Sequence, residues 1–258
     1  MTNMRPQSSA LGAVLFSMLV AGIAQAEIQT EYVDYQHGDT VLSGYLAYDD
    51  SMEGRRPGVL LVHHRDGLDE ETLESARMIA EMGYVVLAAD MFGKGVLPQT
   101  VPEMQALTGV FNSDRMLTRP RAQAGLDWLS ASSMVDNTRL AAIGYCFGGN
   151  VAIELAESGA DLNGVIPVHG SFRNLVPEDA RNIQGQVLIL HGAEDQVAPL
   201  EVVNSLIADF RAAEVDWQLE LYSGATHGFT NPEGAAEERA DREYKAAIER
   251  FFAEIFGT

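Results

Sequence analysis

The stretch GYCFGG, residues 144–149, contains the single cysteine of this 258-residue chain and joins two contrasting runs of sequence. The run before it, 139–143, is short and apolar, which is typical of a strand buried on both faces. The run after it, 150–156, has the pattern of a helix. Cys146 is therefore predicted to lie on a strand-to-helix turn. A chain that turns this sharply around a nucleophile needs glycine two positions before it and two after it, and glycine stands at both.

Cys146 has two interpretations. A lone cysteine is commonly a small buried apolar residue. At the N-terminus of a helix, however, the helix dipole and the free N–H groups favour the thiolate and can hold an oxyanion. The glycines around Cys146 favour the second interpretation, in which the thiol is a nucleophile.

The first 26 residues have the order of a secretory signal peptide: Arg5, then an apolar stretch over 10–23, then the small-residue sequence Ala24-Gln25-Ala26. We expect cleavage after Ala26 and export, either to a bacterial periplasm or by secretion. An uncleaved membrane anchor is the alternative, although the apolar stretch is short for a membrane span.

Residues 27–258 are predicted to form a single domain, since their length suits one α/β core. The whole chain has 17 basic and 37 acidic residues and a formal net charge of −20. This charge argues against nucleic acid and anionic membranes as partners, and we expect no stable membrane association after cleavage. A single cysteine excludes an internal disulfide.

The patterns along residues 27–258 alternate between strand and helix. An N-terminal antiparallel hairpin is expected from two alternating stretches, 30–35 and 41–48, that flank a turn. A strand at 58–63, a helix at 70–82 and a strand at 84–89 imply a right-handed crossover and a parallel sheet. Further strands are expected at 164–168, 186–190 and 217–222, and further helices at 101–111, 119–130, 200–213 and 239–256. The sequence thus predicts an α/β fold with a mostly parallel central sheet, helices on both faces and the hairpin at its start.

Two residues that could assist the thiol follow later strands. Asp195 comes shortly after the strand at 186–190, and His227 follows the strand at 217–222. Each alone is an ordinary turn or loop residue, and Glu194 is the alternative acid. Because the carboxyl ends of parallel strands meet at one edge of a sheet, Cys146, Asp195 and His227 can converge there. The order nucleophile, acid, histidine is that of the α/β-hydrolase fold.

Four segments of the chain resemble the dienelactone hydrolase (carboxymethylenebutenolidase) family of α/β-hydrolases. Three of them carry the predicted site residues: GYCFGG at 144–149, HGAED at 191–195 and GATHGF at 224–229. The fourth, ADMFGKG at 89–95, is similar to an exported branch of the family. Its glycines lack the spacing of a phosphate-binding loop.

The resemblance implies a role for each site residue. Cys146 would be the nucleophile, His227 the base and acid, and Asp195 the residue that orients the histidine. The backbone N–H groups of Phe147 and Arg65 would form the oxyanion hole. The resemblance implies no metal and no organic cofactor.

The chain departs from the family pattern at two positions. His64 stands where the family usually has a glutamate that holds the resting thiol, and Thr230-Asn231 stands where an arginine binds the substrate carboxylate. We predict that His64 and Asn231 line the site, with a solvent-facing loop histidine as the alternative for His64. A metal site at His63 and His64 is disfavoured, because adjacent strand residues point to opposite faces.

The predicted reaction is a two-step acyl transfer in which the thiol attacks an ester or lactone and water releases the acid. The expected partner is a small-molecule ester, lactone or thioester. The alternatives are a thioesterase, a redox sensor that uses Cys146, or a non-catalytic binding protein on the same fold. Arg65, Arg115 and Arg173 are the candidates for binding a substrate carboxylate.

Overall fold

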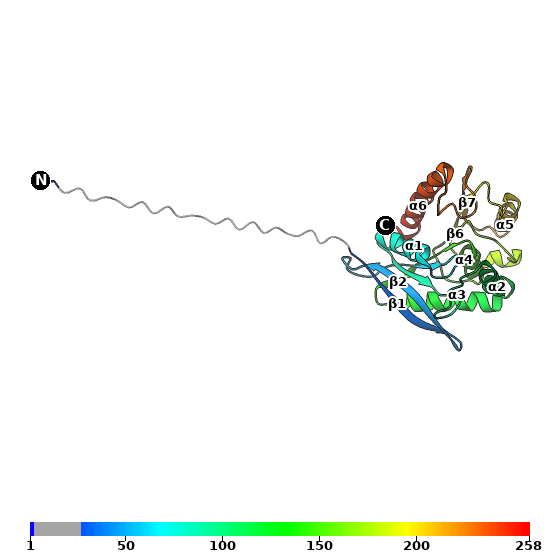
Figure 1. Ribbon diagram of the computed structural model, residues 1–258, viewed down its shortest axis with the longest axis horizontal. Coiled ribbons are helices and arrows are strands. Elements are labelled where there is room, and N and C mark those ends of the chain that lie inside the picture. Colours follow the sequence, from blue (N-terminus) through cyan, green and yellow to red (C-terminus); the bar gives the residue numbers. More distant parts are fainter. Residues whose placement is uncertain (3–26) are drawn as a thin grey trace.

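The computed structural model describes Met1, Thr2 and residues 27–258 (Figure 1). Apart from its first two residues, the predicted signal peptide lies outside the described residues. Within the described part of the chain, no helix is both long enough and apolar enough to cross a membrane.

Eight strands of the described residues form one sheet in the order β1-β2-β4-β3-β5-β6-β7-β8. Strands β1 and β2 are paired antiparallel, β2 is antiparallel to β4, and the remaining pairs are parallel. The predicted mostly parallel sheet with an N-terminal hairpin is confirmed. The strands are β1 Ile28–His37, β2 Thr40–Asp49, β3 Arg56–Val62, β4 Val85–Ala89, β5 Val135–Tyr145, β6 Gly164–Val168, β7 Gln186–Gly192 and β8 Trp217–Tyr222.

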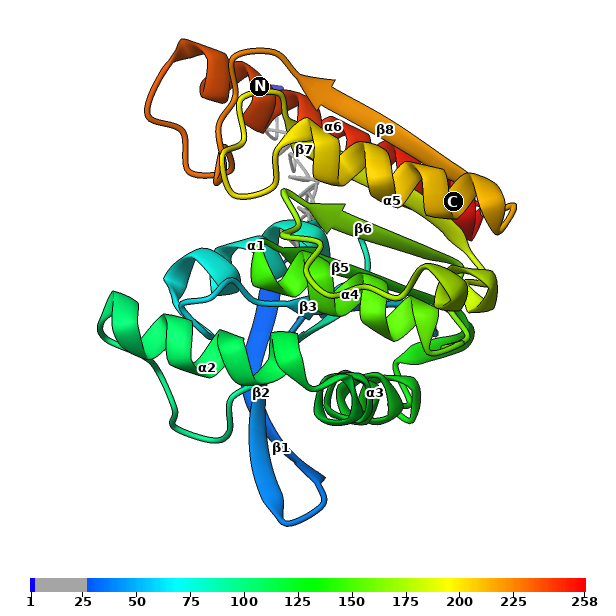
Figure 2. The same ribbon diagram turned by 90° about the vertical axis from the view of Figure 1, so that its right-hand side faces the viewer.

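Helices cover both faces of this sheet, as predicted (Figure 2). The buried side chains of α1 and α6 pack on one face, and those of α3, α4 and α5 pack on the other. The helices are α1 Glu70–Glu81, α2 Val101–Ser113, α3 Arg115–Ser130, α4 Phe147–Glu157, α5 Leu200–Ala212 and α6 Ala235–Phe256, with a short 3-10 helix, η1, at Pro177–Asn182.

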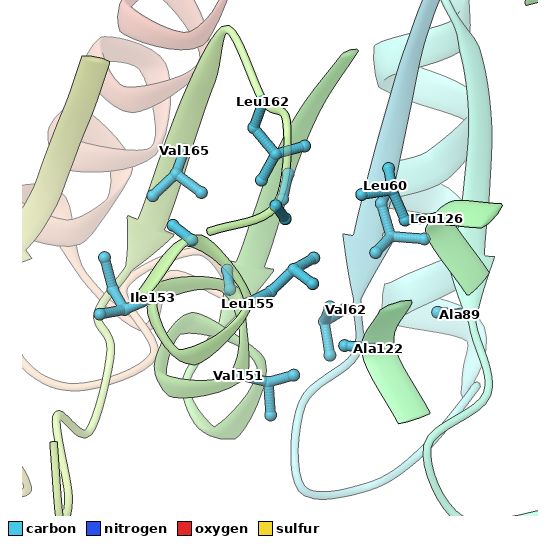
Figure 3. Packing of buried hydrophobic residues seen from close by; sticks show 14 of the residues in the cluster. Leu60, Val62, Ala89, Ala122, Leu126, Val151, Ile153, Leu155, Leu162 and Val165 are labelled. Carbon is cyan, nitrogen blue, oxygen red and sulfur yellow. The ribbon is translucent and has the colours of Figure 1, made fainter. Parts of the chain in front are cut away.

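Strand β3 shows why the central strands read as unbroken apolar runs. Its side chains alternate between the two faces, so Leu60 and Val62 pack toward α3 and α4 while Val59 and Leu61 pack toward α1 and α6. Figure 3 shows the first pair beside side chains of α3 and α4. All four are fully buried, because the strand has a helix layer on each side.

Several elements begin earlier than the sequence patterns predicted. Helix α3 begins at Arg115 rather than at residue 119, because the Asp114 carboxylate accepts hydrogen bonds from two N–H groups of its first turn. Pro120 lies inside this helix and does not end it. Strand β5 extends back to Val135 through a register shift against β3. The short helix η1 was not predicted.

The turn between β5 and α4 has the geometry that its glycines predicted. Cys146 has φ 52° and ψ −109°, in the left-handed region that side chains rarely adopt. A Cβ at Gly144 would lie 2.1 Å from the carbonyl oxygen of Gly148, and one at Gly148 would lie 2.2 Å from that of Val62. Both glycines are therefore required by close backbone approach rather than by their own dihedral angles.

The substitution Gly148→Ala is expected to lower the free energy of unfolding by about 3 kcal/mol or more, because backbone atoms must move to admit the methyl group. Gly109→Ala is the matched control: Gly109 lies in α2 with no atom within 4 Å of an added Cβ. The control should stabilise the protein by about 0.5–1 kcal/mol. Urea unfolding of both variants measures this, and equal stabilities would contradict the close-approach account.

Candidate active site

The three residues predicted to act together lie in one hydrogen-bonded chain. His227 Nε2 lies 3.0 Å from Cys146 Sγ, and His227 Nδ1 donates to Asp195 Oδ2 at 2.8 Å. Cys146 follows β5, Asp195 follows β7, and His227 follows β8, so strand ends bring the three together. Of the two candidate acids, Asp195 is buried and bonded to the histidine, whereas Glu194 is exposed.

Asp195 is held from both sides. Its Oδ1 accepts hydrogen bonds from the backbone N–H groups of Val197 at 2.7 Å and Ala198 at 2.9 Å. Burial opposes ionisation of this carboxyl, but the hydrogen bonds from His227 and from these N–H groups outweigh it and lower its pKa. The group is therefore an anion fixed against His227.

The ring of His227 is electrostatically biased toward the imidazolium. Burial lowers its pKa, but the hydrogen bonds to Asp195 and Cys146 have a larger combined effect and raise the pKa from 6.5 to about 9. A proton that leaves the thiol can therefore be held on this ring at neutral pH.

A cavity of about 920 Å³ opens in front of the thiol. Phe147 and Arg65, whose N–H groups were predicted to form an oxyanion hole, both contribute to its wall together with Cys146. His64 and Asn231, which were predicted to line the site, also contribute to it. The cavity wall is thus built from helices α1, α2, α4 and α6 and from the loops after β3, β5, β6, β7 and β8.

His64 is buried rather than solvent-facing. Its ring stacks on Tyr145 with the centroids 5.1 Å apart, and its Nε2 lies 3.4 Å from Glu71 Oε1. Burial lowers the pKa of His64 to about 4, so the ring is neutral at physiological pH. The thiol bonds to His227 instead, so His64 does not occupy the position of a resting-state partner.

His63 lies on the opposite side of the chain from His64, as expected for adjacent residues. Its ring packs edge-on against Phe92, and its Nδ1 bonds to the carbonyl oxygen of His64 at 2.5 Å. Among residues 27–258, no group of three or more histidine, cysteine or acidic side chains is arranged to hold a metal ion.

The sequence patterns did not reveal His169, a third histidine on the wall of the cavity. This fully buried residue directly follows β6 and meets the ring of His227 edge-on at a centroid distance of 4.8 Å. Its Nε2 lies 3.2 Å from Thr230 Oγ1, which in turn donates to Glu71 Oε1 at 3.4 Å. The same strand-end argument that found Asp195 and His227 also applies to a histidine placed directly after 164–168.

The three arginines considered for carboxylate binding differ in position. Arg65 and Arg173 line the cavity. Arg115 is not among the described lining residues, and its guanidinium donates to the carbonyl oxygen of Asn174 at 2.7 Å. Asp179 lies 3.8 Å from the same guanidinium. Arg115 therefore ties α3 to the loop after β6.

A mostly parallel sheet with a nucleophile, an acid and a histidine at its strand ends, in that order, defines the α/β-hydrolase class. The chain belongs to the dienelactone hydrolase family, whose model matches residues 42–256, and it is a hydrolase of carboxylic ester or lactone bonds.

Two solved structures are similar to this chain over most of its length, and one further relative is similar to part of it. The structure named m3DLH is 36% identical, with a TM-score of 0.84, and the match covers 88% of this chain and 98% of that one. A dienelactone hydrolase-like promiscuous phosphotriesterase from metagenomic libraries is 34% identical, with a TM-score of 0.83 and coverage of 90% and 99%. The carboxymethylenebutenolidase homolog of Mus musculus is 29% identical over 107 residues, 41% of this chain and 43% of its own length.

The bond between His227 and Asp195 predicts a pH dependence. In the wild-type protein the His227 ring should titrate near pH 9, and in Asp195→Asn its pKa should fall, because only the contact with Cys146 then opposes the effect of burial. NMR titration of the ring measures both values.

The same pKa shift affects stability. A histidine whose pKa is higher in the folded protein than in the unfolded chain stabilises the fold fully below pH 6.5, and this contribution disappears as the pH rises through about 9. The stability advantage of wild type over Asp195→Asn should therefore be larger at pH 6 than above pH 9. An advantage that stays constant across this range would contradict the assignment.

Proposed function

We propose that this protein cleaves an ester or lactone by covalent catalysis at Cys146, with His227 as the base and acid and Asp195 as its orienting carboxylate. The observation that carries the proposal is the hydrogen-bonded chain of these three side chains at the wall of a cavity large enough for a small molecule.

In the first step the sulfur attacks the substrate carbonyl carbon while its proton resides on His227 Nε2. The carbonyl π electrons move to oxygen, and a tetrahedral intermediate forms. When it collapses, the C–O bond to the leaving alcohol breaks, and the imidazolium returns its proton to that oxygen. The product of this step is a thioester between the acyl group and Cys146.

The oxyanion of this intermediate is assigned to two backbone N–H groups. One belongs to Phe147, the first residue of α4, where the helix dipole also favours negative charge. The other belongs to Arg65, in the loop after β3 that faces the same cavity. Donors on backbone need no reorganisation when the charge develops, which is the main source of their effect.

In the second step His227 removes a proton from water, whose oxygen attacks the thioester carbon. Collapse of the second intermediate breaks the C–S bond, releases the acid and restores the thiol with the proton from the imidazolium. A thioester substrate could follow the same route, because its leaving thiol is expelled as easily as Cys146 itself. Thioesters therefore belong in the first substrate panel.

A phosphotriester belongs in that panel as well, because one structural relative of 34% identity is described as a promiscuous phosphotriesterase. A redox sensor is less well supported than hydrolysis, because the chain has no second cysteine to resolve an oxidised Cys146.

We further propose that residues 27–258 are the mature single domain and that the protein is exported, as in the branch of the family that shares the segment at 89–95. The order of charge, apolar stretch and small residues in 1–26 supports this. Mass spectrometry of the protein recovered from a bacterial periplasm should find Glu27 at the N-terminus, and an intact Met1 would contradict export with cleavage.

The substitution Cys146→Ala should lower kcat for hydrolysis of p-nitrophenyl acetate by about 10⁴-fold or more, because no acyl-enzyme can form. Stoichiometric iodoacetamide should have the same effect on the wild type, since Cys146 is the only thiol. Circular dichroism serves as the folding control. Activity that survives both treatments would exclude the thiol as nucleophile and favour a different catalytic group.

A further inference from the structure

The residues that line the cavity in front of Cys146 indicate the class of substrate. This inference rests on the proposed function. Few of the cavity's described lining residues have a purely hydrocarbon side chain. Phe147 and Val197 are its only residues with a hydrocarbon side chain, and Phe147 is 2% exposed, which leaves Val197 as the one substantial apolar contribution. Pockets for small apolar ligands are lined mainly by aliphatic and aromatic side chains, and the side chains around this cavity differ from that pattern.

Neutral hydrogen-bonding side chains occupy much of the wall instead. Helix α2 contributes Gln105, Thr108 and Asn112, and the loop between β8 and α6 contributes Thr226 and Asn231. Figure 2 shows α2 toward one end of this edge of the sheet and that loop toward the other. Amide and hydroxyl groups from two separate segments thus line the cavity.

Four of the lining residues have a buried polar side-chain atom with no hydrogen-bond partner among the described residues. They are His64 through Nε2, Asn112 through Oδ1, His169 through Nδ1 and Ser171 through Oγ. An unpaired buried polar atom is costly, and the side chains of Asn112 and Ser171 end in rotatable bonds that can turn toward a group entering the cavity. A substrate hydroxyl can serve as donor or acceptor, so it can satisfy either atom.

The charges on the lining disfavour an anionic substrate. Four carboxylates line the cavity: Asp66, Glu71, Glu233 and Glu237. The cationic groups on the lining are the guanidinium groups of Arg65 and Arg173 and the imidazolium of His227, and the last of these is already paired with Asp195. Arg65 lies 3.8 Å from one of these carboxylates, that of Asp66, which further reduces its attraction for an anion. The chain as a whole carries a formal net charge of −20.

From these observations we infer that the substrate is a neutral ester or lactone that carries hydroxyl groups, rather than a hydrocarbon ester or a carboxylate-bearing lactone. The amides and hydroxyls of the wall bind the substrate hydroxyls, and the excess of carboxylates excludes acids. Specificity then depends on hydrogen bonds that a hydrocarbon analogue would leave unmade.

Four esters of matched size test this inference: propyl butanoate, 2,3-dihydroxypropyl butanoate, propyl 3-hydroxybutanoate and propyl hydrogen succinate. The pH-stat rate gives kcat/KM for each, and p-nitrophenyl acetate reports the hydrolase activity itself. At least one hydroxylated ester should be cleaved about tenfold faster than propyl butanoate, as expected for one or two hydrogen bonds. The succinate monoester should be the slowest of the four.

Three variants with the same chemical change locate the preference. Asn112→Leu and Asn231→Leu alter the two segments that line the cavity with amides, and each should reduce the preference for hydroxylated esters by about threefold or more. Asn204→Leu alters an exposed residue of α5 outside the described lining and should leave the preference unchanged. Unfolding curves confirm that each variant is folded.

The outcomes separate the two proposals. If p-nitrophenyl acetate is cleaved but propyl butanoate or the succinate monoester is preferred, the substrate class is wrong and the proposed function stands. A preference that all three variants keep would also overturn the assignment of the binding groups to this wall. If the folded protein cleaves none of these esters, the proposed function fails and the substrate class fails with it.

Discussion

The hydrogen bond between His227 and Asp195 is the interaction on which the rest of the site depends. It joins the loop after β8 to the loop after β7 and raises the pKa of the histidine to about 9. The other ring nitrogen can reach the sulfur of Cys146 only because β5 ends in a turn that holds this residue at φ 52°. Two backbone hydrogen bonds hold that turn against β6 and the loop after it. The N–H of Cys146 donates to the carbonyl oxygen of Val168, and the carbonyl oxygen of Cys146 accepts from the N–H of Ser171. Three loops are thereby held in one geometry by a few short contacts.

A proton held on His227 fits the surroundings of that ring. The nearest histidine, His169, is fully buried, and burial with the charge of His227 lowers its pKa well below 6.5. His64 is likewise neutral. One of the three clustered histidines thus takes the charge, and the other two supply neutral packing, because a second imidazolium nearby would oppose the first.

The sequence was sufficient to predict the sheet and both helix layers, because the strands are short apolar runs separated by helical patterns. It also indicated the residues of the hydrogen-bonded chain, because each of them follows one of these runs. The spacing of the glycines predicted the turn at Cys146. It did so because the backbone passes too close to Gly144 and Gly148 for a side chain at either position. The pairing of β2 with β4 could not be predicted in this way, since it joins segments about forty residues apart with no local signal. The placement of Asn112 and Ser171 on the cavity wall likewise depends on how α2 and the loop after β6 pack, which periodicity alone does not encode.

The cavity shares Cys146 and His227 with the catalytic chain, but most of its wall comes from other residues. Strand ends position the thiol, the histidine and the carboxylate, whereas α2 and the loops after β3, β6 and β8 determine what can approach them. This division is typical of folds that support many reactions, in which a rigid sheet presents the chemistry and variable connections select the substrate. His64 and Asn231, which replace the family's usual residues, both lie in these connecting loops.

The most direct measurement is rapid-quench mass spectrometry of the wild-type protein mixed with p-nitrophenyl acetate. Acid quenching preserves a thioester, and peptide mapping then locates it. The account predicts one acetyl group on the peptide that contains Cys146, formed before the steady state and lost as the substrate is exhausted. Hydrolysis that proceeds while this peptide remains unmodified, or an acetyl group on a different residue, would contradict it.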